Sequence, residues 1–299
     1  MKSPDDGRAS PELPPWYWQL RADVGFGLDQ LATRTAGYAA RMEWQRLLQN
    51  IPDRHRLEHH GRKIYSQNDE DGIIEEIFRR LGLSSCSGQF VEIGVGNGLE
   101  CNTHYLLHCG FAGVWLEGAE DGEPQIRERF RSPLEKGTLR LAHAFITADN
   151  INPLLKANLR ASADTVLLSI DIDGNDFWIW KVIDVITPAV VVIEYNAKFP
   201  PPVSLVQEYR SDFTWSGTDY FGASLEALVT LGNGKGYRLV ACNITGSNAF
   251  FVRKDLLGGH FPYDLTTSNL YHPCRYHLTD DCFRRCGHPP DFGNYVRIE

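Results

Sequence analysis

The sequence lacks an excess of basic residues. Its 299 residues include 30 Lys and Arg against 38 Asp and Glu, which gives a formal net charge of −8. Proteins that bind duplex nucleic acid gain much of their affinity from basic side chains that displace counterions from phosphates. An acidic chain without a run of Lys or Arg therefore argues against nucleic acid, and against an anionic membrane surface, as the main partner. A small uncharged or cationic substrate is compatible with this charge.

Long apolar stretches are also missing. No run approaches the roughly 20 apolar residues that a membrane-spanning helix needs. Residues 1–7 lack the basic-then-apolar order of a secretory signal, so we expect a cytoplasmic protein without a membrane partner. The seven cysteines are odd in number and form no C-x-x-C pair. We therefore expect mostly reduced, buried thiols rather than a disulfide framework.

What is present is the composition of an ordinary globular protein, with 42% hydrophobic and 11% aromatic residues. The length favours one enlarged domain with appendages over two full domains. Residues 1–63 combine a Pro-rich arm, helical spacing of apolar residues and a polar linker. Residues 64–253 carry a regular pattern that indicates a catalytic domain, and residues 254–299 form an extension that contains Cys and His.

Strand and helix patterns alternate within the central region. Short apolar runs predict strands over 89–93, 113–116, 139–146, 165–170 and 189–193. Helical spacing predicts helices over 71–81, 99–109, 123–130, 151–159, 177–185 and 222–231. Two last strands, 237–242 and 248–252, have a connection too short for a parallel crossover. The fold class predicted is α/β, a Rossmann-like doubly wound seven-stranded mostly parallel sheet with a reversed last strand, a helical N-terminal extension and a Cys/His-containing C-terminal tail.

Such a sheet binds its ligands at the carboxyl ends of its strands, and the first expected strand ends in Glu92-Ile93-Gly94-Val95-Gly96-Asn97-Gly98. Glycine allows the backbone to approach a ligand closely, and a following helix points free N–H groups at an anion. A dinucleotide fingerprint would need glycine in place of Leu99. The pattern fits a methyltransferase better, although a purely structural turn remains an alternative.

Acidic residues also end the next two expected strands. Glu117 lies about 20 residues beyond the glycine turn, a spacing that suits hydrogen bonds to ribose hydroxyls. A solvated acid at the end of a strand is the alternative. Asp149 follows the third strand, and its carboxylate suits an adenine amino group or the N-cap of the next helix equally well.

The densest acidic cluster follows the fourth strand, where Asp171, Asp173 and Asp176 lie within six positions. Their mutual repulsion needs a cation, a basic substrate or a helix N-terminus to offset it. Glu194 and Asn196 end the fifth strand nearby. A candidate set of oxygen ligands for Mg²⁺ consists of Asp171, Glu194 and Asn196. Two alternatives are a pocket for a hydroxylated or aminated substrate and a structural capping cluster.

Two further segments contain candidate functional residues. The aromatic and Pro-rich loop 198–221 is long enough to form a lid or a substrate wall. The tail gathers soft metal ligands at His272, Cys274, His277, Cys282, Cys286 and His288. Without a C-x-x-C pair we favour a reduced, packed tail over a structural zinc site.

Several of these motifs together resemble the FkbM-type class I S-adenosylmethionine-dependent methyltransferases, which are related to TylF-type sugar O-methyltransferases. The resemblance rests on Val91 to Gly98, on Ser169-Ile170-Asp171-Ile172-Asp173-Gly174-Asn175-Asp176, on Val190 to Glu194 and on the upstream Ser66-Gln67 segment. It covers about residues 64–253. Ser169 stands where Lys is frequent in the family, Asp173 is shorter than the usual Glu, and no Asp-Asp pair ends the fifth strand.

The resemblance implies methyl transfer from S-adenosyl-L-methionine to an oxygen or nitrogen of a sugar, an aminoglycoside or another small natural-product scaffold, with Mg²⁺ as a candidate metal. The residues it and the motifs assign to cofactor binding are Gln67, Glu92, Gly94, Gly96, Asn97, Gly98, Glu117, Asp149 and Ser169. Asp171 is our first choice of base, before Asp173 and before His104 or His108. An NAD(P)-dependent oxidoreductase and a repurposed, non-methylating member of the fold are the competing hypotheses. The expected partner is a small-molecule acceptor, and a homo-oligomer stays open.

Overall fold

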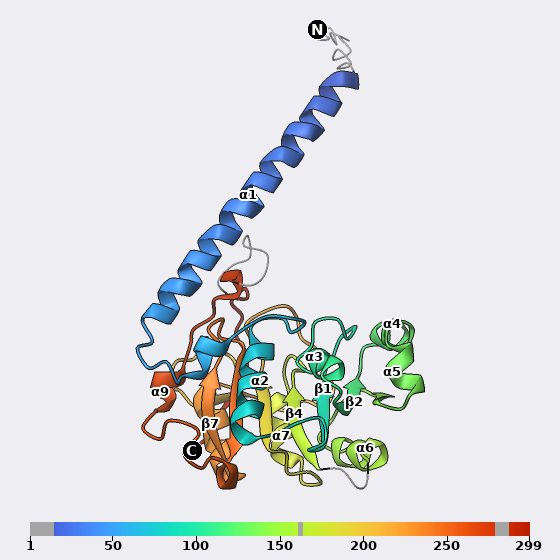
Figure 1. Ribbon diagram of the computed structural model, residues 1–299, viewed down its shortest axis with the longest axis vertical. Coiled ribbons are helices and arrows are strands. Elements are labelled where there is room, and N and C mark those ends of the chain that lie inside the picture. Colours follow the sequence, from blue (N-terminus) through green and yellow to red (C-terminus); the bar gives the residue numbers. More distant parts are fainter. Residues whose placement is uncertain (1–14, 161–163, 279–286) are drawn as a thin grey trace, which may run out of the picture.

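The protein is built on one seven-stranded sheet with helices on both faces (Figure 1). The computed structural model describes residues 15–160, 164–278 and 287–299. The strands are β1 (Gln89–Ile93), β2 (Ala112–Glu117), β3 (Leu139–His143), β4 (Thr165–Ile170), β5 (Val190–Glu194), β7 (Tyr237–Cys242) and β8 (Asn248–Arg253). Their order is β3-β2-β1-β4-β5-β8-β7, and β8 is antiparallel to both of its neighbours. The predicted fold class, including the reversed last strand, is confirmed.

The central strands are apolar because both of their faces are covered. β5 has the sequence VVVIE, and its first four residues are fully buried. β1 lies between β2 and β4 in parallel register. The ladder continues past the strands, since Gly94 N–H donates to Leu116 O and Asp171 N–H donates to Ile93 O. The carboxyl ends of these three strands are therefore held side by side.

Two apolar cores separate the sheet from its two layers of helices. One core contains residues of α2 (Glu70–Leu81), α3 (His104–His108) and α4 (Gly122–Arg129), and the other contains residues of α6 (Ile151–Asn158), α7 (Asp176–Val182) and α8 (Leu225–Gly234). α5 (Arg131–Glu135) follows α4 directly. α2 ends at Gly82 in the left-handed conformation, with φ of 66°. This glycine therefore caps the C-terminal end of the helix.

Three predicted elements are shorter in the structure. β3 ends at His143 instead of residue 146, α7 ends at Val182 instead of residue 185, and α3 begins at His104 instead of residue 99. The helix starts late because the buried carboxylate of Glu92 binds the backbone N–H groups of Asn102 and Thr103, at 2.8 and 3.0 Å. That contact holds residues 99–103 as a loop. The expectation that a helix directly follows the glycine turn is therefore wrong.

The N-terminal extension is a single long helix, α1 (Pro15–Gln49), which projects away from the sheet (Figure 1). Val24, Leu31 and Tyr38 lie exposed along it. The Pro-rich arm over residues 1–14 and the aromatic side chains at 16–18 lie outside what the structure describes. η1 (Leu57–His60) connects α1 to the body. Among the described helices, none is long and apolar enough to cross a membrane.

The C-terminal extension folds back over the body of the protein. It contains η2 (Lys254–Leu256), α9 (Thr267–Leu270), η3 (Tyr276–Leu278) and β9 (Tyr295–Arg297). β9 pairs antiparallel with β6 (Leu205–Gln207), which lies within the loop predicted over 198–221. None of the five described cysteines forms a disulfide. Cys101 and Cys242 are buried, but Cys86 and Cys109 are exposed, so the expectation of mostly buried thiols is only partly met. Cys282 and Cys286, on which the zinc alternative depends, lie outside the described residues.

Candidate functional site at the carboxyl edge of the sheet

The glycine turn after β1 is built by two different constraints. At Gly94 the φ angle is 80°, and a β-carbon would lie 1.7 Å from the carbonyl oxygen of Asp171. Only glycine fits so close to the end of β4. At Gly96 the φ angle is 55°, but a β-carbon would meet no atom within 4 Å. Space therefore exists beside the backbone of Gly96, as a ligand held at this turn requires.

Glu117, at the end of β2, faces this turn. Its carboxylate accepts hydrogen bonds from the N–H groups of Val95 and Gly96 at 2.8 and 2.6 Å, and from that of Ala119 at 2.7 Å. A carboxylate offers about four acceptor positions, so about one is left for a further donor. The side chain is 6% exposed. The structure thus brings Glu117 and Gly96 together, as their spacing predicted, and the remaining acceptor position fits a ribose hydroxyl.

Gly122, at the start of α4, was missed by the sequence analysis. A β-carbon there would lie 2.6 Å from the backbone oxygen of Gly96 and 3.1 Å from Cγ of Glu117. The first turn of α4 therefore packs closely against both. The signal in the sequence was a glycine five residues after Glu117, in a segment otherwise suited to a helix.

Other residues that the sequence assigned to the cofactor bind the segment that follows the glycine turn. Glu92 is 1% exposed, and its carboxylate binds the N–H groups that precede α3 and the hydroxyl of Thr103. Ser169 is fully buried and its hydroxyl accepts from the Asn102 amide at 3.0 Å. The Asn97 side chain accepts from the N–H of Leu99 at 3.0 Å. These contacts give Glu92 and Ser169 a scaffold function in this structure.

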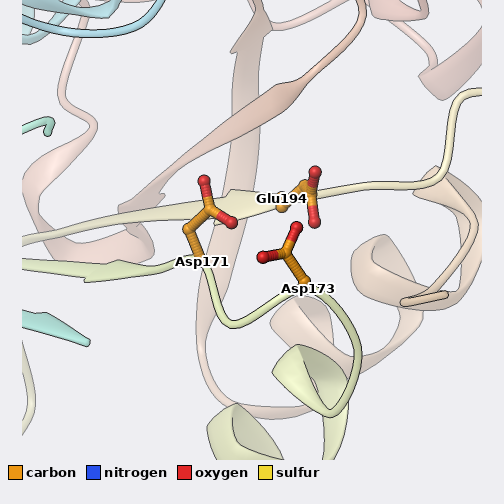
Figure 2. Close-up of side chains that lie close together, drawn as sticks. All are labelled: Asp171, Asp173 and Glu194. Atoms are coloured by element: carbon orange, nitrogen blue, oxygen red, sulfur yellow. The ribbon is translucent and has the colours of Figure 1, made fainter. Parts of the chain in front are cut away.

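Three carboxylates converge where β4 and β5 end (Figure 2). Asp171, Asp173 and Glu194 each place an oxygen within 4.8 Å of the other two. Asp173 has a φ angle of 54° and is the only residue other than glycine with positive φ in the described part of the chain. A residue other than glycine in this left-handed region is often found at functional sites. This conformation directs the Asp173 side chain toward the other two carboxylates.

The environment makes these acids costly to ionise without a counter-charge. Burial raises the pKa of Asp171 and of Glu194 well above the usual range, and neighbouring carboxylates add to both shifts. Partial desolvation and the charge of Asp176 raise the pKa of Asp173 to about 6. Among the described residues, none of the three forms an ion pair. The group therefore fits a bound cation or a donor-rich substrate.

Asp176 has a different function from its neighbours. Its buried carboxylate accepts hydrogen bonds from the N–H groups of Ile172 and Gly174, both at 2.9 Å. Asp176 therefore fixes the turn that presents Asp173. It does not cap α7, whose N-cap residue Asn175 makes no side-chain cap hydrogen bond, so the capping alternative is wrong for this acid.

Three predicted site residues belong neither to the glycine turn nor to the group of carboxylates: Asn196, Asp149 and Gln67. The Asn196 amide donates to the backbone oxygens of Asp219 and Phe221, both at 2.9 Å, and its oxygen accepts from Lys198 N–H. Asp173, rather than Asn196, thus joins Asp171 and Glu194. Asp149 is exposed, and the residue at the N-cap position of α6 is Asn150. Gln67 is exposed and its backbone oxygen accepts from Lys63.

The loop 198–221 covers this edge of the sheet. The hydroxyl of Tyr209 accepts from Ala148 N–H beyond β3, and Asn175 donates to the backbone oxygen of Arg210 near the end of β4. A β-carbon on Gly174 would lie 2.5 Å from the ring of Phe213. These contacts with the ends of two strands support the prediction of a wall over the site.

The tail reaches the same edge beyond β5. Tyr195, directly after Glu194, donates its hydroxyl to the backbone oxygen of His272 at 2.6 Å. Cys274 and Tyr276 follow, and their Sγ and hydroxyl oxygen lie 3.8 Å apart. The charges of Glu194 and Asp171 contribute to a raised pKa of Tyr276, whose main cause is burial. Sequence analysis favoured a packed tail over a zinc site, without naming Tyr276.

No protein-family model matches this sequence, and no curated protein matches it in sequence. Solved structures that share parts of its shape include the glycopeptide N-methyltransferase MtfA complexed with S-adenosyl-L-homocysteine, at 11% identity, 60% coverage of this chain, 86% of that chain and a TM-score of 0.37. A second is an S-adenosylmethionine-dependent methyltransferase from Clostridium acetobutylicum, at 11% identity, 60% and 89% coverage and a TM-score of 0.37. A third is the CcbJ methyltransferase from Streptomyces caelestis, at 10% identity, 60% coverage of this chain, 88% coverage of that chain and a TM-score of 0.37. These sequence identities and TM-scores are too low to carry an argument, so the fold assignment depends on the strand order described above.

Proposed function

We propose that this protein is an S-adenosyl-L-methionine-dependent methyltransferase of the FkbM type, which acts on an oxygen or nitrogen of a small acceptor such as a sugar, an aminoglycoside or another natural-product scaffold. One observation supports this most strongly: Glu117 faces Gly96 of the glycine turn, and a group of carboxylates lies at the same edge of the sheet. A dinucleotide-binding sheet has the order 3-2-1-4-5-6, whereas here the reversed β8 separates β5 from β7.

The residues that would hold the cofactor are those around the turn. Gly96 leaves room beside its backbone, and Glu117 retains capacity for a ribose hydroxyl. The exposed residues Asp149 and Gln67 would complete the site, Asp149 at the adenine amino group from the loop after β3 and Gln67 from the segment before α2. Bound there, the cofactor supplies an electrophilic methyl group on a sulfonium.

The carboxylates near β4 and β5 would orient and deprotonate the acceptor. Methyl transfer to a hydroxyl or an ammonium requires loss of a proton and a nucleophile aligned with the methyl group. Asp171 lies against the glycine turn through its backbone, so it is the base that we assign, with Asp173 beside it. Asp171, Asp173 and Glu194 also suit a divalent cation such as Mg²⁺, which would orient vicinal hydroxyls.

Calorimetry with the purified chain tests this proposal. S-Adenosyl-L-homocysteine, the demethylated product, should bind with micromolar affinity, and NADH should not. Glu117→Gln should weaken the first affinity about 10- to 100-fold, since a hydrogen bond to a charged group contributes about 1.5–3 kcal/mol. The exposed neighbour Glu120 is the matched control, and Glu120→Gln should leave the affinity unchanged.

Two results would overturn the proposal. Binding of NADH without binding of S-adenosyl-L-homocysteine would favour the oxidoreductase hypothesis. Binding of neither nucleotide would favour a repurposed member of the fold.

A further inference from the structure

A cavity of about 480 Å³ is lined by residues of α3 and of the α4–α5 segment, and none of the three convergent carboxylates belongs to its wall. This volume falls within the range of small-molecule binding sites, roughly 300–1,000 Å³. Apolar side chains form much of its wall, among them Leu107 from α3, and Phe130 and Pro133 from the second segment. No motif identified in the sequence accounts for this cavity.

The charge of the wall is opposite to that of the protein. Arg129 and Lys136 line the cavity together with His104 and His108, and no Asp or Glu is among the lining residues. Arg129 donates one hydrogen bond, to the Gln125 side chain at 3.0 Å. Within the described part of the chain, neither cation is paired with a carboxylate. In a chain with a net charge of −8, two unpaired cations over an apolar wall favour an anion with an apolar body.

We propose that this cavity binds a small organic anion, with its carboxylate, phosphate or sulfonate group at Arg129 and Lys136 and its apolar body against Phe130. The two exposed cations confer the charge selectivity. The apolar wall provides the contact area, and the imidazoles of His104 and His108 supply further polar contacts.

The cavity shares a wall with the glycine turn. A β-carbon on Gly98 would lie 2.8 Å from the ring of Phe130 and 2.8 Å from that of Trp115. The two rings pack edge to face, with centroids 4.7 Å apart. On the other side, the ring of His104 contacts Phe130, and its Nδ1 lies 3.1 Å from the backbone oxygen of Leu99. An anion seated on Phe130 therefore restrains Gly98 and Leu99.

This coupling makes the cavity an effector site for the glycine turn, an extension that rests on the proposed function. A ligand that binds two conformations of the turn with equal affinity would not shift the equilibrium between them. The contact of Phe130 with Gly98 provides the differential interaction, because movement of the ring changes the space available to the turn.

The probe for the binding test is 8-anilinonaphthalene-1-sulfonate, an aromatic anion whose fluorescence rises in apolar surroundings. N-Phenyl-1-naphthylamine, which lacks the sulfonate, is the neutral comparison. The native chain should bind the anion at least tenfold more tightly than the neutral compound. The double variant Arg129→Gln/Lys136→Gln should lose that preference, while Arg127→Gln, an exposed residue of the same helix outside the cavity wall, should retain it.

Equal binding of the anion by the native chain and the double variant would overturn the site. Both substituted side chains are exposed, and circular dichroism checks that the variants are folded. Hydrogen exchange tests the coupling without the cofactor: the saturating anion should slow exchange of the backbone amides of residues 95–98, which do not line the cavity, in the native chain but not in the double variant. No change in exchange would overturn the effector function alone. Failure to bind S-adenosyl-L-homocysteine would overturn the proposed function and, with it, the effector function, but not the anion site.

Discussion

The carbonyl oxygen of Asp171 lies where a side chain on Gly94 would begin: a β-carbon at Gly94 would be 1.7 Å away from it. The glycine turn after β1 and the acidic turn after β4 therefore touch through their backbones. This contact fixes the position of the proposed base relative to the proposed cofactor turn. A shift of either strand end would move both groups together.

Substitutions at Gly94 and Gly96 should separate stability from binding. Gly94→Ala places a methyl group into the Asp171 carbonyl, and we expect it to destabilise the fold by about 3 kcal/mol or more. Gly96→Ala meets no neighbouring atom, so only the left-handed backbone costs energy, about 1 kcal/mol. It should nevertheless abolish binding of S-adenosyl-L-homocysteine, because its methyl group fills the space beside the turn. Urea unfolding and calorimetry measure the two effects. Full affinity in Gly96→Ala would contradict our placement of the cofactor.

Magnesium should bind the convergent carboxylates in a pH-dependent manner. Carboxylates must be ionised to ligate a metal, and the pKa of Asp173 is raised to about 6. We therefore expect MgCl₂ to raise the melting temperature at pH 8 and to have little effect at pH 5.5. Glu194→Gln should abolish the rise, and the exposed control Asp184→Asn should not. The same rise in Glu194→Gln as in the native chain would place the metal elsewhere.

The buried carboxylate of Asp69 should make the fold less stable as the pH rises. Asp69 is 1% exposed, neither of its oxygens has a hydrogen-bond partner within the described residues, and burial raises its pKa well above the usual value. Because the folded state holds this proton more tightly than the unfolded state, its contribution is largest below the usual pKa. The contribution is lost as the pH rises toward the folded pKa.

Asp69→Asn removes the ionisable group and, with it, the destabilisation at high pH. It should therefore raise the free energy of unfolding at pH 8 more than at pH 5. Urea unfolding at both pH values measures the difference, with Asp184→Asn as the control for the loss of one negative charge. Equal effects of Asp69→Asn at the two pH values would show that Asp69 is not the group responsible.

Asn196 should act on the acceptor through the loop that it holds. Asn196→Ala removes two hydrogen bonds to the backbone of residues 219 and 221. We expect a loss of about 1–3 kcal/mol in stability and a several-fold higher KM for the acceptor. The affinity for S-adenosyl-L-homocysteine should not change, because the glycine turn lies on other strands. A loss of Mg²⁺ binding equal to that in Glu194→Gln would instead make Asn196 a metal ligand.

The sequence was sufficient to predict the sheet because its strands carry strong local signals. The run VVVIE of β5 is apolar at four successive positions and becomes a strand buried on both faces. Glycine and acidic residues at strand ends were equally visible. Since the carboxyl ends of parallel strands meet at one edge, the proximity of Glu117 to the turn followed from the topology.

What the sequence did not reveal depends on contacts between distant segments. Glu92 has the same local pattern as an acid that binds a ligand, and only the fold shows that its carboxylate holds the loop before α3. β6 and β9 are three residues long and almost ninety positions apart, so neither has a detectable signal of its own. The cavity beside Phe130 likewise depends on side chains of α3 and of the α4–α5 segment, which no local pattern brings together.

The most direct test is a crystal structure with S-adenosyl-L-homocysteine bound. We predict density along the glycine turn, with the ribose within hydrogen-bond distance of Glu117 and the sulfur facing Asp171. Density for the nucleoside at any other edge of the sheet, with the Glu117 carboxylate still bound only to the backbone of Val95, Gly96 and Ala119, would contradict the account.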